Sequence, residues 1–198
     1  IPSMKDYPAM KPPLAKAIPA DGKFKPFERD PESLVPSWAL PGQKGFEHRV
    51  GGLEKNHDGV LSNDPANHQT MVDERLSKVN KIADFIPELE VDGDRKGKLL
   101  VVGWGGTFGH ILSAVHEVRE TGKNVSRVHF DYIFPVPRNT GEVLGNFETI
   151  LVCELNGGQF ANYLRTLFPG TNIIKFNKVQ GQPFMVNELT DAILKALK

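Results

Sequence analysis

The chain has 198 residues, of which 39% are hydrophobic and 24% charged, a balance that allows a globular core and excludes wholesale disorder. Its 24 basic and 24 acidic side chains leave no net formal charge, which argues against a nucleic-acid-binding surface. The length allows one large or two small domains.

Cys153 is the only cysteine, which excludes an internal disulfide and any zinc or iron–sulfur site built from cysteines of this chain alone. No apolar run approaches the roughly 20 residues that a membrane span needs. No secretory signal is visible, so we expect a cytoplasmic protein without a membrane partner. The chain opens with Ile-Pro-Ser rather than Met, which predicts a fragment of a longer protein.

Residues 1–63 are expected to form an extended, Pro/Gly-rich arm. Nine of the 15 prolines lie between Pro2 and Pro41, and proline disrupts helix interiors and central strands. The arm nevertheless carries scattered large apolar side chains, which a solvated linker would not need. These are Met4, Tyr7, Phe24, Phe27, Leu34, Trp38 and Phe46. We therefore expect the arm to bury isolated anchors against its own domain or against a partner.

The last part of the arm, residues 42–59, is a polar loop with five glycines. Its chemistry-bearing side chains are His48, Arg49, Glu54 and His57, and they predict a loop that faces a ligand or another subunit. An ordinary surface crossover is the alternative. The two histidines are nine residues apart, which is not a metal-ligand spacing, so no metal is expected here.

Residues 64–96 are predicted to form a connecting helix and a charged spacer. Asp64 suits the N-cap position, Pro65 suits the first helical position, and Pro87 ends the pattern. One apolar stripe with helical spacing lies between them, made of Val72, Leu76, Val79, Ala83 and Ile86. The spacer marks the expected boundary to the next domain.

Residues 97–198 alternate between strand and helix patterns, which predicts a three-layer α/β domain with a mostly parallel, Rossmann-like sheet. Leu99–Val102 is apolar throughout, as in strands buried on both faces. Helix Thr107–Glu120 follows, with Phe108, Ile111, Leu112, Val115 and Val118 at helical spacing. The remaining predicted strands are 125–130, 149–154 and 172–176, and the remaining helices 139–146, 157–168 and one after Pro183.

The turn between that first strand and helix carries Gly103, Gly105, Gly106 and Thr107. It nearly matches the dinucleotide-binding fingerprint, with Asp131 at the end of the next strand, but Phe108 occupies the third glycine position. A tight turn with Trp104 packed outward, a nucleotide or phosphate site, and a contact with a subunit or cofactor domain all remain open.

No spacing in the chain predicts a catalytic constellation, since neither a nucleophile elbow nor a phosphate-binding loop is present. Cys153 lies within an apolar strand and is expected to be an inert core thiol. Ligands of open α/β sheets bind at the carboxyl ends of the strands. Polar residues that follow the later strands could form such a rim: Glu154, Asn156, Gln159 and the segment 177–184, including Asn177 and Gln182.

Several motifs together resemble one enzyme family. They are, in chain order, Phe46–Gly52, Gly51–Gly59, the helix start Asn67-His68, Gly103–Thr107 and Asn177–Phe184. With these motifs the chain resembles the C-terminal part of the alpha subunit of 2-oxoacid:ferredoxin oxidoreductases, most of all the 2-oxoglutarate type that forms succinyl-CoA. The resemblance covers nearly the whole chain and implies a transketolase C-terminal-like domain at 97–198.

The resemblance implies an enzyme that decarboxylates a 2-oxoacid with thiamine diphosphate and Mg, transfers the acyl group to CoA, and reduces ferredoxin through an iron–sulfur cluster. The segments of the family that carry this chemistry lie in the pyrimidine-binding domain and the beta subunit, which are the implied partners. The thiamine diphosphate fingerprint is Gly-Asp-Gly followed by Asn-Asn, and Asp92-Gly93-Asp94 does not match it.

We therefore expect this chain to bind no cofactor or metal, to carry no catalytic residue, and to serve as a structural and assembly portion that is inactive alone. The alternative from a different class is an independent Rossmann-like nucleotide-binding module that uses Gly103, Gly105 and Asp131.

Overall fold

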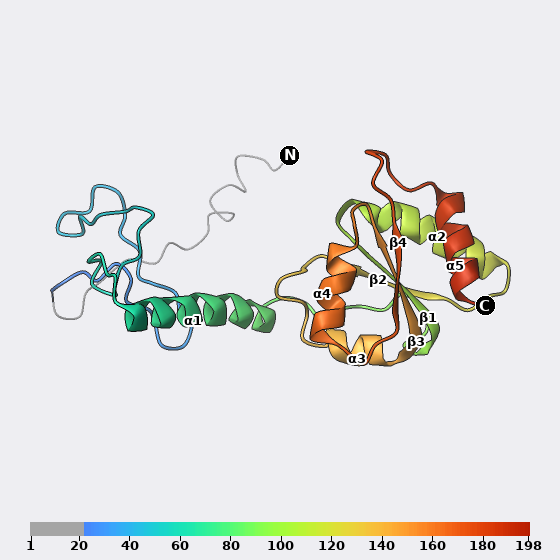
Figure 1. The fold of residues 1–198 in the computed structure, drawn as a ribbon, viewed down its shortest axis with the longest axis horizontal. Helices are drawn as coiled ribbons and strands as arrows, with labels where there is room; N and C mark the ends of the chain where they lie inside the picture. The colour runs from blue at the N-terminus through green and yellow to red at the C-terminus, as the bar shows by residue number, and fades with distance from the viewer. Residues whose placement is uncertain (1–21) are drawn as a thin grey trace, which may run out of the picture. The chain divides into compact units, whose positions relative to one another are not determined.

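The structure, a computed structural model, describes residues 22–198. The chain divides after Lys81 into two compact units. The second unit contains a sheet of four parallel strands in the order β2-β1-β3-β4 (Figure 1). The strands are β1 (Gly97–Trp104), β2 (Ser126–Phe130), β3 (Phe147–Glu154) and β4 (Ile173–Asn177). The parallel α/β fold predicted from the sequence is confirmed.

Helices cover both faces of the sheet, giving three layers. One face carries α2 (Phe108–Glu120) and α5 (Val186–Ala196), and the other carries α3 (Thr140–Gly145) and α4 (Gln159–Leu167) (Figure 1). Parallel strands need crossover connections, and α2, α3 and α4 supply them, while α5 follows the last strand. The strands are consequently buried on both sides.

Strand β1 shows why an uninterrupted apolar run was needed. Leu100 and Val102 point into the core beneath α3 and α4, whereas Leu99 and Val101 point into the core beneath α2 and α5. All four side chains are at most 1% exposed. Alternate residues of a strand face opposite sides, so the middle of a strand between two helical layers favours apolar side chains at every position.

Helix α2 differs from the prediction at its first turn. Ile111, Val115 and Val118 are buried as expected, and Ala114 joins them. Phe108 is 45% exposed, because it is the first residue of the helix and lies beside the edge strand β2 rather than over the sheet.

The first unit is described from residue 22 to Lys81 and contains one long helix, α1 (Pro65–Lys81). Asp64 caps the helix, since its Oδ1 accepts the backbone N–H of Ala66 at 3.0 Å. Between residues 22 and 63 the described chain forms only isolated antiparallel bridges, at Arg29–Pro36 and Lys55–Leu61. Predicted anchors before Gly22 lie outside the described residues.

The predicted apolar stripe lies only in part on α1, because the helix ends at Lys81 and Ala83 and Ile86 lie beyond it. The part on α1 remains largely uncovered. Met71 is the buried residue of this helix, and it lies beside the stripe rather than in it. Val72 is 38% exposed and Leu76 is 51% exposed. The described residues of this unit therefore leave an apolar helix face accessible.

Candidate functional site

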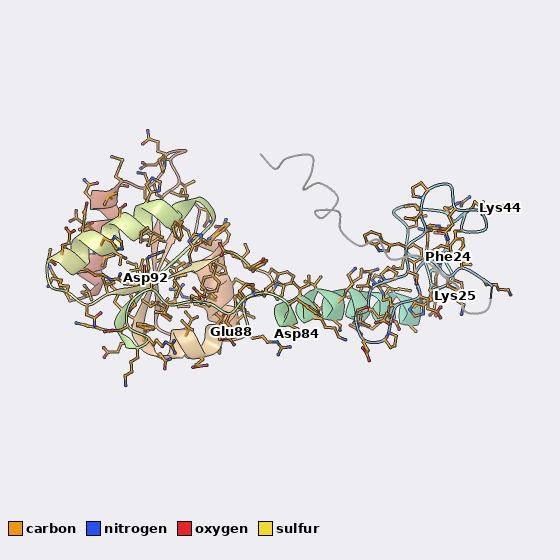
Figure 2. All side chains as sticks on the ribbon, turned by 180° about the vertical axis from the view of Figure 1, so that it is seen from behind. Phe24, Lys25, Lys44, Asp84, Glu88 and Asp92 are labelled. Atoms are coloured by element: carbon orange, nitrogen blue, oxygen red, sulfur yellow. The ribbon has the colours of Figure 1, made fainter. Side chains whose placement is uncertain are left out.

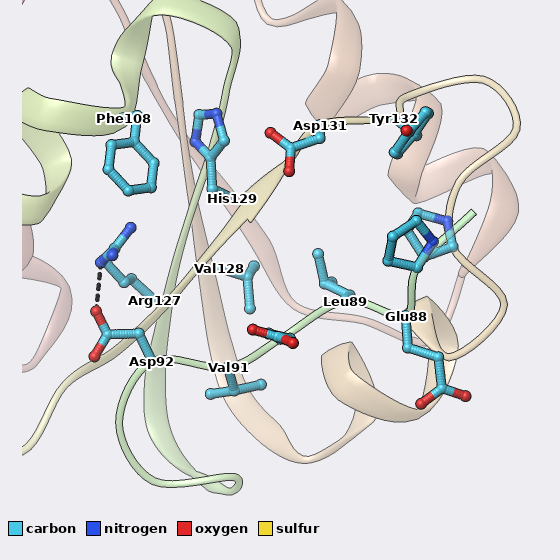
Figure 3. A pocket seen from close by; sticks show the side chains of 13 residues that line it. Glu88, Leu89, Val91, Asp92, Phe108, Arg127, Val128, His129, Asp131 and Tyr132 are labelled. Atoms are coloured by element: carbon cyan, nitrogen blue, oxygen red, sulfur yellow. Dashed lines mark hydrogen bonds and ion pairs between the residues drawn. The ribbon is translucent and has the colours of Figure 1, made fainter. Parts of the chain in front are cut away.

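A cavity of about 580 Å³ opens beside the edge strand β2, within the second unit (Figure 3). The segment that precedes β1 forms one wall, because Asp92 pairs with Arg127 through two backbone hydrogen bonds of 2.9 and 3.0 Å. Leu89, Val91 and Val128 supply apolar surface, and Phe108 and Tyr132 supply aromatic surface. We call this the β2-edge cavity.

The carboxylate of Asp92 joins two arginines at one end of this cavity. It accepts Nε of Arg127 at 2.7 Å and Nη1 of Arg119 at 2.9 Å. Partial burial raises the pKa of Asp92, but the hydrogen bond and charge of Arg119 and the charge of Arg127 outweigh it and hold the pKa below its ordinary value of 3.8. Asp92 therefore compensates buried charge and is not available as a general base.

Phe108 and His129 lie next to this ion pair (Figure 3). The Arg127 guanidinium carbon lies 4.8 Å from the centroid of the Phe108 ring, and the His129 ring meets Phe108 edge-on at 5.0 Å. Burial lowers the pKa of His129 below 6.5, against the opposing charge of Asp131. Burial therefore favours the neutral imidazole. Within the described residues no side-chain hydroxyl or thiol is hydrogen-bonded to it as a base–nucleophile pair requires.

The glycine turn after β1 is explained by packing. A Cβ on Gly103 would lie 2.3 Å from Cδ1 of Ile111, and Gly105 has a φ of +57°. The hydroxyl of Thr107 is committed to the turn, since it donates to the Trp104 carbonyl at 2.9 Å and accepts the Trp104 N–H at 3.1 Å. A Cβ on Gly106 would meet nothing within 4 Å.

Neither these glycines nor Thr107 lines the β2-edge cavity, whereas Asp131 does. The turn and Asp131 therefore do not share the β2-edge cavity. Nucleotide binding by this chain stays a prediction, which saturable binding of NAD or AMP would test. Trp104 does not pack outward, because it is half-buried and its Nε1 lies 3.4 Å from Oε2 of Glu154.

The polar rim expected at the carboxyl ends of the strands is committed to the fold only in part. Glu154 is fully buried and accepts the backbone N–H groups of Phe160 at 3.0 Å and Ala161 at 2.9 Å. Asn156 accepts the N–H of Gly158 at 2.7 Å. Asn177, Gln159 and Gln182 are exposed.

In the arm, two of the four candidate loop residues turn inward to α1. Glu54 accepts two hydrogen bonds from Arg75, both of 2.9 Å, and His57 lies 3.1 Å from Glu74. His48 packs against the Phe24 ring at 5.2 Å, while Arg49 is exposed. Sequence reasoning identified Glu54 and His57 but did not predict their contacts with α1.

Asp92 and Asp94 do not fit a site for thiamine diphosphate or its metal. The carboxylate of Asp92 is occupied by two arginines, and Asp94 is hydrogen-bonded to Asn124. Among residues 22–198 no group of three or more His, Cys, Asp or Glu side chains is placed to hold a metal ion. Burial raises the pKa of the Cys153 thiol far above its ordinary value, so this thiol is inert.

Comparisons with known proteins confirm the resemblance found in the motifs. No protein-family model matches the chain. The 2-oxoglutarate oxidoreductase subunit KorA of Mycobacterium tuberculosis is 39% identical over 201 residues, covering all of this chain and 30% of that protein. The alpha subunit of 2-oxoacid:ferredoxin oxidoreductase 1 of Aeropyrum pernix is 29% identical, covering 89% of this chain and 28% of that protein.

Among solved structures, the 2-oxoglutarate:ferredoxin oxidoreductase from Magnetococcus marinus, with 2-oxoglutarate, coenzyme A and succinyl-CoA bound, superposes with a TM-score of 0.82. The match covers 92% of this chain and 32% of that chain at 24% identity, which shows a shared fold. The chain thus spans somewhat under a third of the curated oxidoreductase subunits that it matches. No helix in the described part of the chain is long and apolar enough to span a membrane.

Proposed function

We propose that this chain is the C-terminal portion of the alpha subunit of a 2-oxoacid:ferredoxin oxidoreductase whose substrate is 2-oxoglutarate. The intact complex converts the 2-oxoacid and CoA to succinyl-CoA and CO₂ and reduces ferredoxin. The observation that carries this proposal is the 39% identity to KorA of M. tuberculosis along the whole chain.

Within that enzyme we assign this portion a structural role rather than a catalytic one. The support is chemical, because three of the acidic groups described above already have structural partners. Glu154 caps a helix, Asp92 pairs with two arginines, and Glu54 pairs with Arg75. Thiamine diphosphate, Mg, the iron–sulfur cluster and the reacting substrate then belong to the pyrimidine-binding domain and the beta subunit.

The proposed role in assembly rests on the uncovered face of α1. A 17-residue helix with Val72 and Leu76 exposed on one side gains stability when a partner covers that side, since buried apolar area contributes about 25 cal/mol per Å². We assign this face to a contact with the pyrimidine-binding domain or the beta subunit, and contact with ferredoxin to the assembled complex.

The test uses the full-length alpha subunit co-expressed with its beta subunit. Leu76→Asp places a charge on the apolar face of α1, and Ser77→Asp places the same charge on an exposed neighbouring position. We expect the first change to lower the yield of complex at least fivefold and the second to leave it unchanged. Ferredoxin reduction with 2-oxoglutarate and CoA, normalised to assembled complex, is expected to stay within twofold for both.

Normal assembly of the Leu76→Asp protein would contradict the assembly role. Loss of turnover per assembled complex would contradict the non-catalytic assignment. The substrate assignment is tested separately, by comparing kcat/KM for 2-oxoglutarate and pyruvate in the unmodified complex.

A further inference from the structure

A second cavity, of about 520 Å³, lies within the first unit between the loop 51–55 and helix α1. Phe27 and Met71 form apolar parts of its wall, and the other side chains that line it are mostly charged. We call it the arm cavity. Its volume lies within the range of about 300–1,000 Å³ that small-molecule sites usually have.

Lys55 is a buried cation in the wall of this cavity. It is 5% exposed and donates to the carbonyls of Gly51 at 3.0 Å and Leu53 at 2.8 Å. Its Nζ also lies 5.8 Å from the centroid of the Phe27 ring. None of the described carboxylates forms an ion pair with it. A buried charge is costly without an opposite charge. An anion bound beside Lys55 would therefore interact with it favourably.

Arg75 and His68 lie at the rim and hold Glu54 between them. Arg75 donates from both terminal nitrogens to the carboxylate oxygens of Glu54, each at 2.9 Å. His68 Nδ1 lies 3.0 Å from Oε2 of Glu54. An arginine has five N–H donors, so Glu54 leaves three of them on Arg75 for another acceptor. The rim is therefore preorganised by Glu54 without being saturated by it.

Counting charges shows an excess of positive charge around the arm cavity. Its lining includes Arg29, Lys55 and Arg75, against the one carboxylate of Glu54. Arg29 is compensated by Glu74, at 2.7 Å, so the uncompensated charge belongs to Lys55. An anionic ligand would neutralise this positive charge.

We infer that the arm cavity binds the oxyanion of a small molecule, a phosphate or a carboxylate, with Lys55 and Arg75 as its donors. Charge-assisted hydrogen bonds to such groups are about twice as strong as neutral ones. The inference is independent of the proposed function, because it rests on the side chains of the first unit alone.

The test measures hydrogen exchange of the purified protein in inorganic phosphate, in succinate and in chloride at constant ionic strength. We expect phosphate or succinate to slow exchange at least threefold in peptides that cover residues 51–55 and 68–75. Protection by phosphate alone identifies a phosphate ligand, and protection by succinate alone identifies a carboxylate.

Arg75→Gln is the decisive variant, because glutamine keeps a donor for Glu54 but removes the charge, and titration calorimetry should show at least tenfold weaker binding. Lys55→Met is less clean, since Lys55 also holds two loop carbonyls. Lys44→Gln removes the same charge at an exposed position of the arm and should bind like the parent (Figure 2). No protection by either anion, or equal binding by the Arg75 and Lys44 variants, would overturn the inference.

Discussion

The buried carboxylate of Glu154, at the end of β3, accepts the backbone N–H of Ala161, in the first turn of α4, at 2.9 Å. Its other oxygen accepts the N–H of Phe160 at 3.0 Å. The first N–H groups of a helix have no partner within the helix, and a negative charge there also interacts favourably with the helix dipole. One side chain thus fixes α4 to the sheet.

Glu154→Leu is expected to lower the free energy of unfolding by about 2–4 kcal/mol, because it leaves two buried N–H groups without an acceptor. Glu154→Gln should cost less, since the amide oxygen still accepts one of them. Urea denaturation of both proteins measures which of them loses more free energy of unfolding. Glu148→Gln, at an exposed position of the same strand, should match the parent. Equal stability of the two proteins changed at Glu154 would refute the capping role.

Gly103→Ala is expected to destabilise the second unit by about 1–3 kcal/mol, because the added Cβ would overlap Ile111 and Thr107. Gly106→Ala meets nothing within 4 Å and should be nearly neutral. Thermal unfolding of the two proteins distinguishes the positions. A neutral Gly103→Ala would show that the turn is looser than described.

Gly105→Val is expected to cost about 1–3 kcal/mol through its backbone alone, since valine strongly disfavours a φ of +57°. A Cβ at this position would have no neighbouring atom within 4 Å, so the Cβ itself adds no steric overlap. Gly105→Asn should lose less than Gly105→Val, because asparagine tolerates left-handed conformations. In chemical denaturation the parent should be the most stable, Gly105→Asn less stable and Gly105→Val the least stable. A reversed ranking of the two variants would contradict the backbone argument.

Asp92→Asn is expected to lower the free energy of unfolding by about 1 kcal/mol at pH 7, a small value because the carboxylate is 39% exposed and water screens it. The pKa of Asp92 is lower in the folded protein than its ordinary 3.8, so its stabilisation is complete well above pH 3.8. The stabilisation is lost as the pH falls from there through the folded pKa. Urea unfolding at pH 7, 5 and 3.5 should show the difference from the parent shrinking at pH 3.5. A pH-independent difference would contradict the ion-pair account.

The sequence allowed the second unit to be predicted closely, because its signals are local. The apolar run of β1, the glycines after it and the helical spacing of Ile111, Val115 and Val118 each predict their own element. The ordered motifs added the family resemblance, which the relatives confirm.

The site could be predicted only in part, because its determinants connect distant residues. Nothing local shows that Asp92 pairs with Arg127, 35 residues later, or that Glu54 meets Arg75, 21 residues later. Glu154 was considered as a rim residue, whereas in the structure it caps α4. A polar side chain at a strand end is equally compatible with a cap or a ligand, so the sequence does not distinguish the two. The exposure of Leu76 could not be predicted either, because an apolar stripe does not show what covers it.

The most direct test of the assembly role is hydrogen exchange of the alpha subunit, measured alone and after its beta subunit is added. The account predicts that peptides covering residues 66–81 exchange at least tenfold more slowly in the complex, with Val72 and Leu76 within the protected region. A complex that forms and turns over while these peptides exchange at their original rate would contradict it.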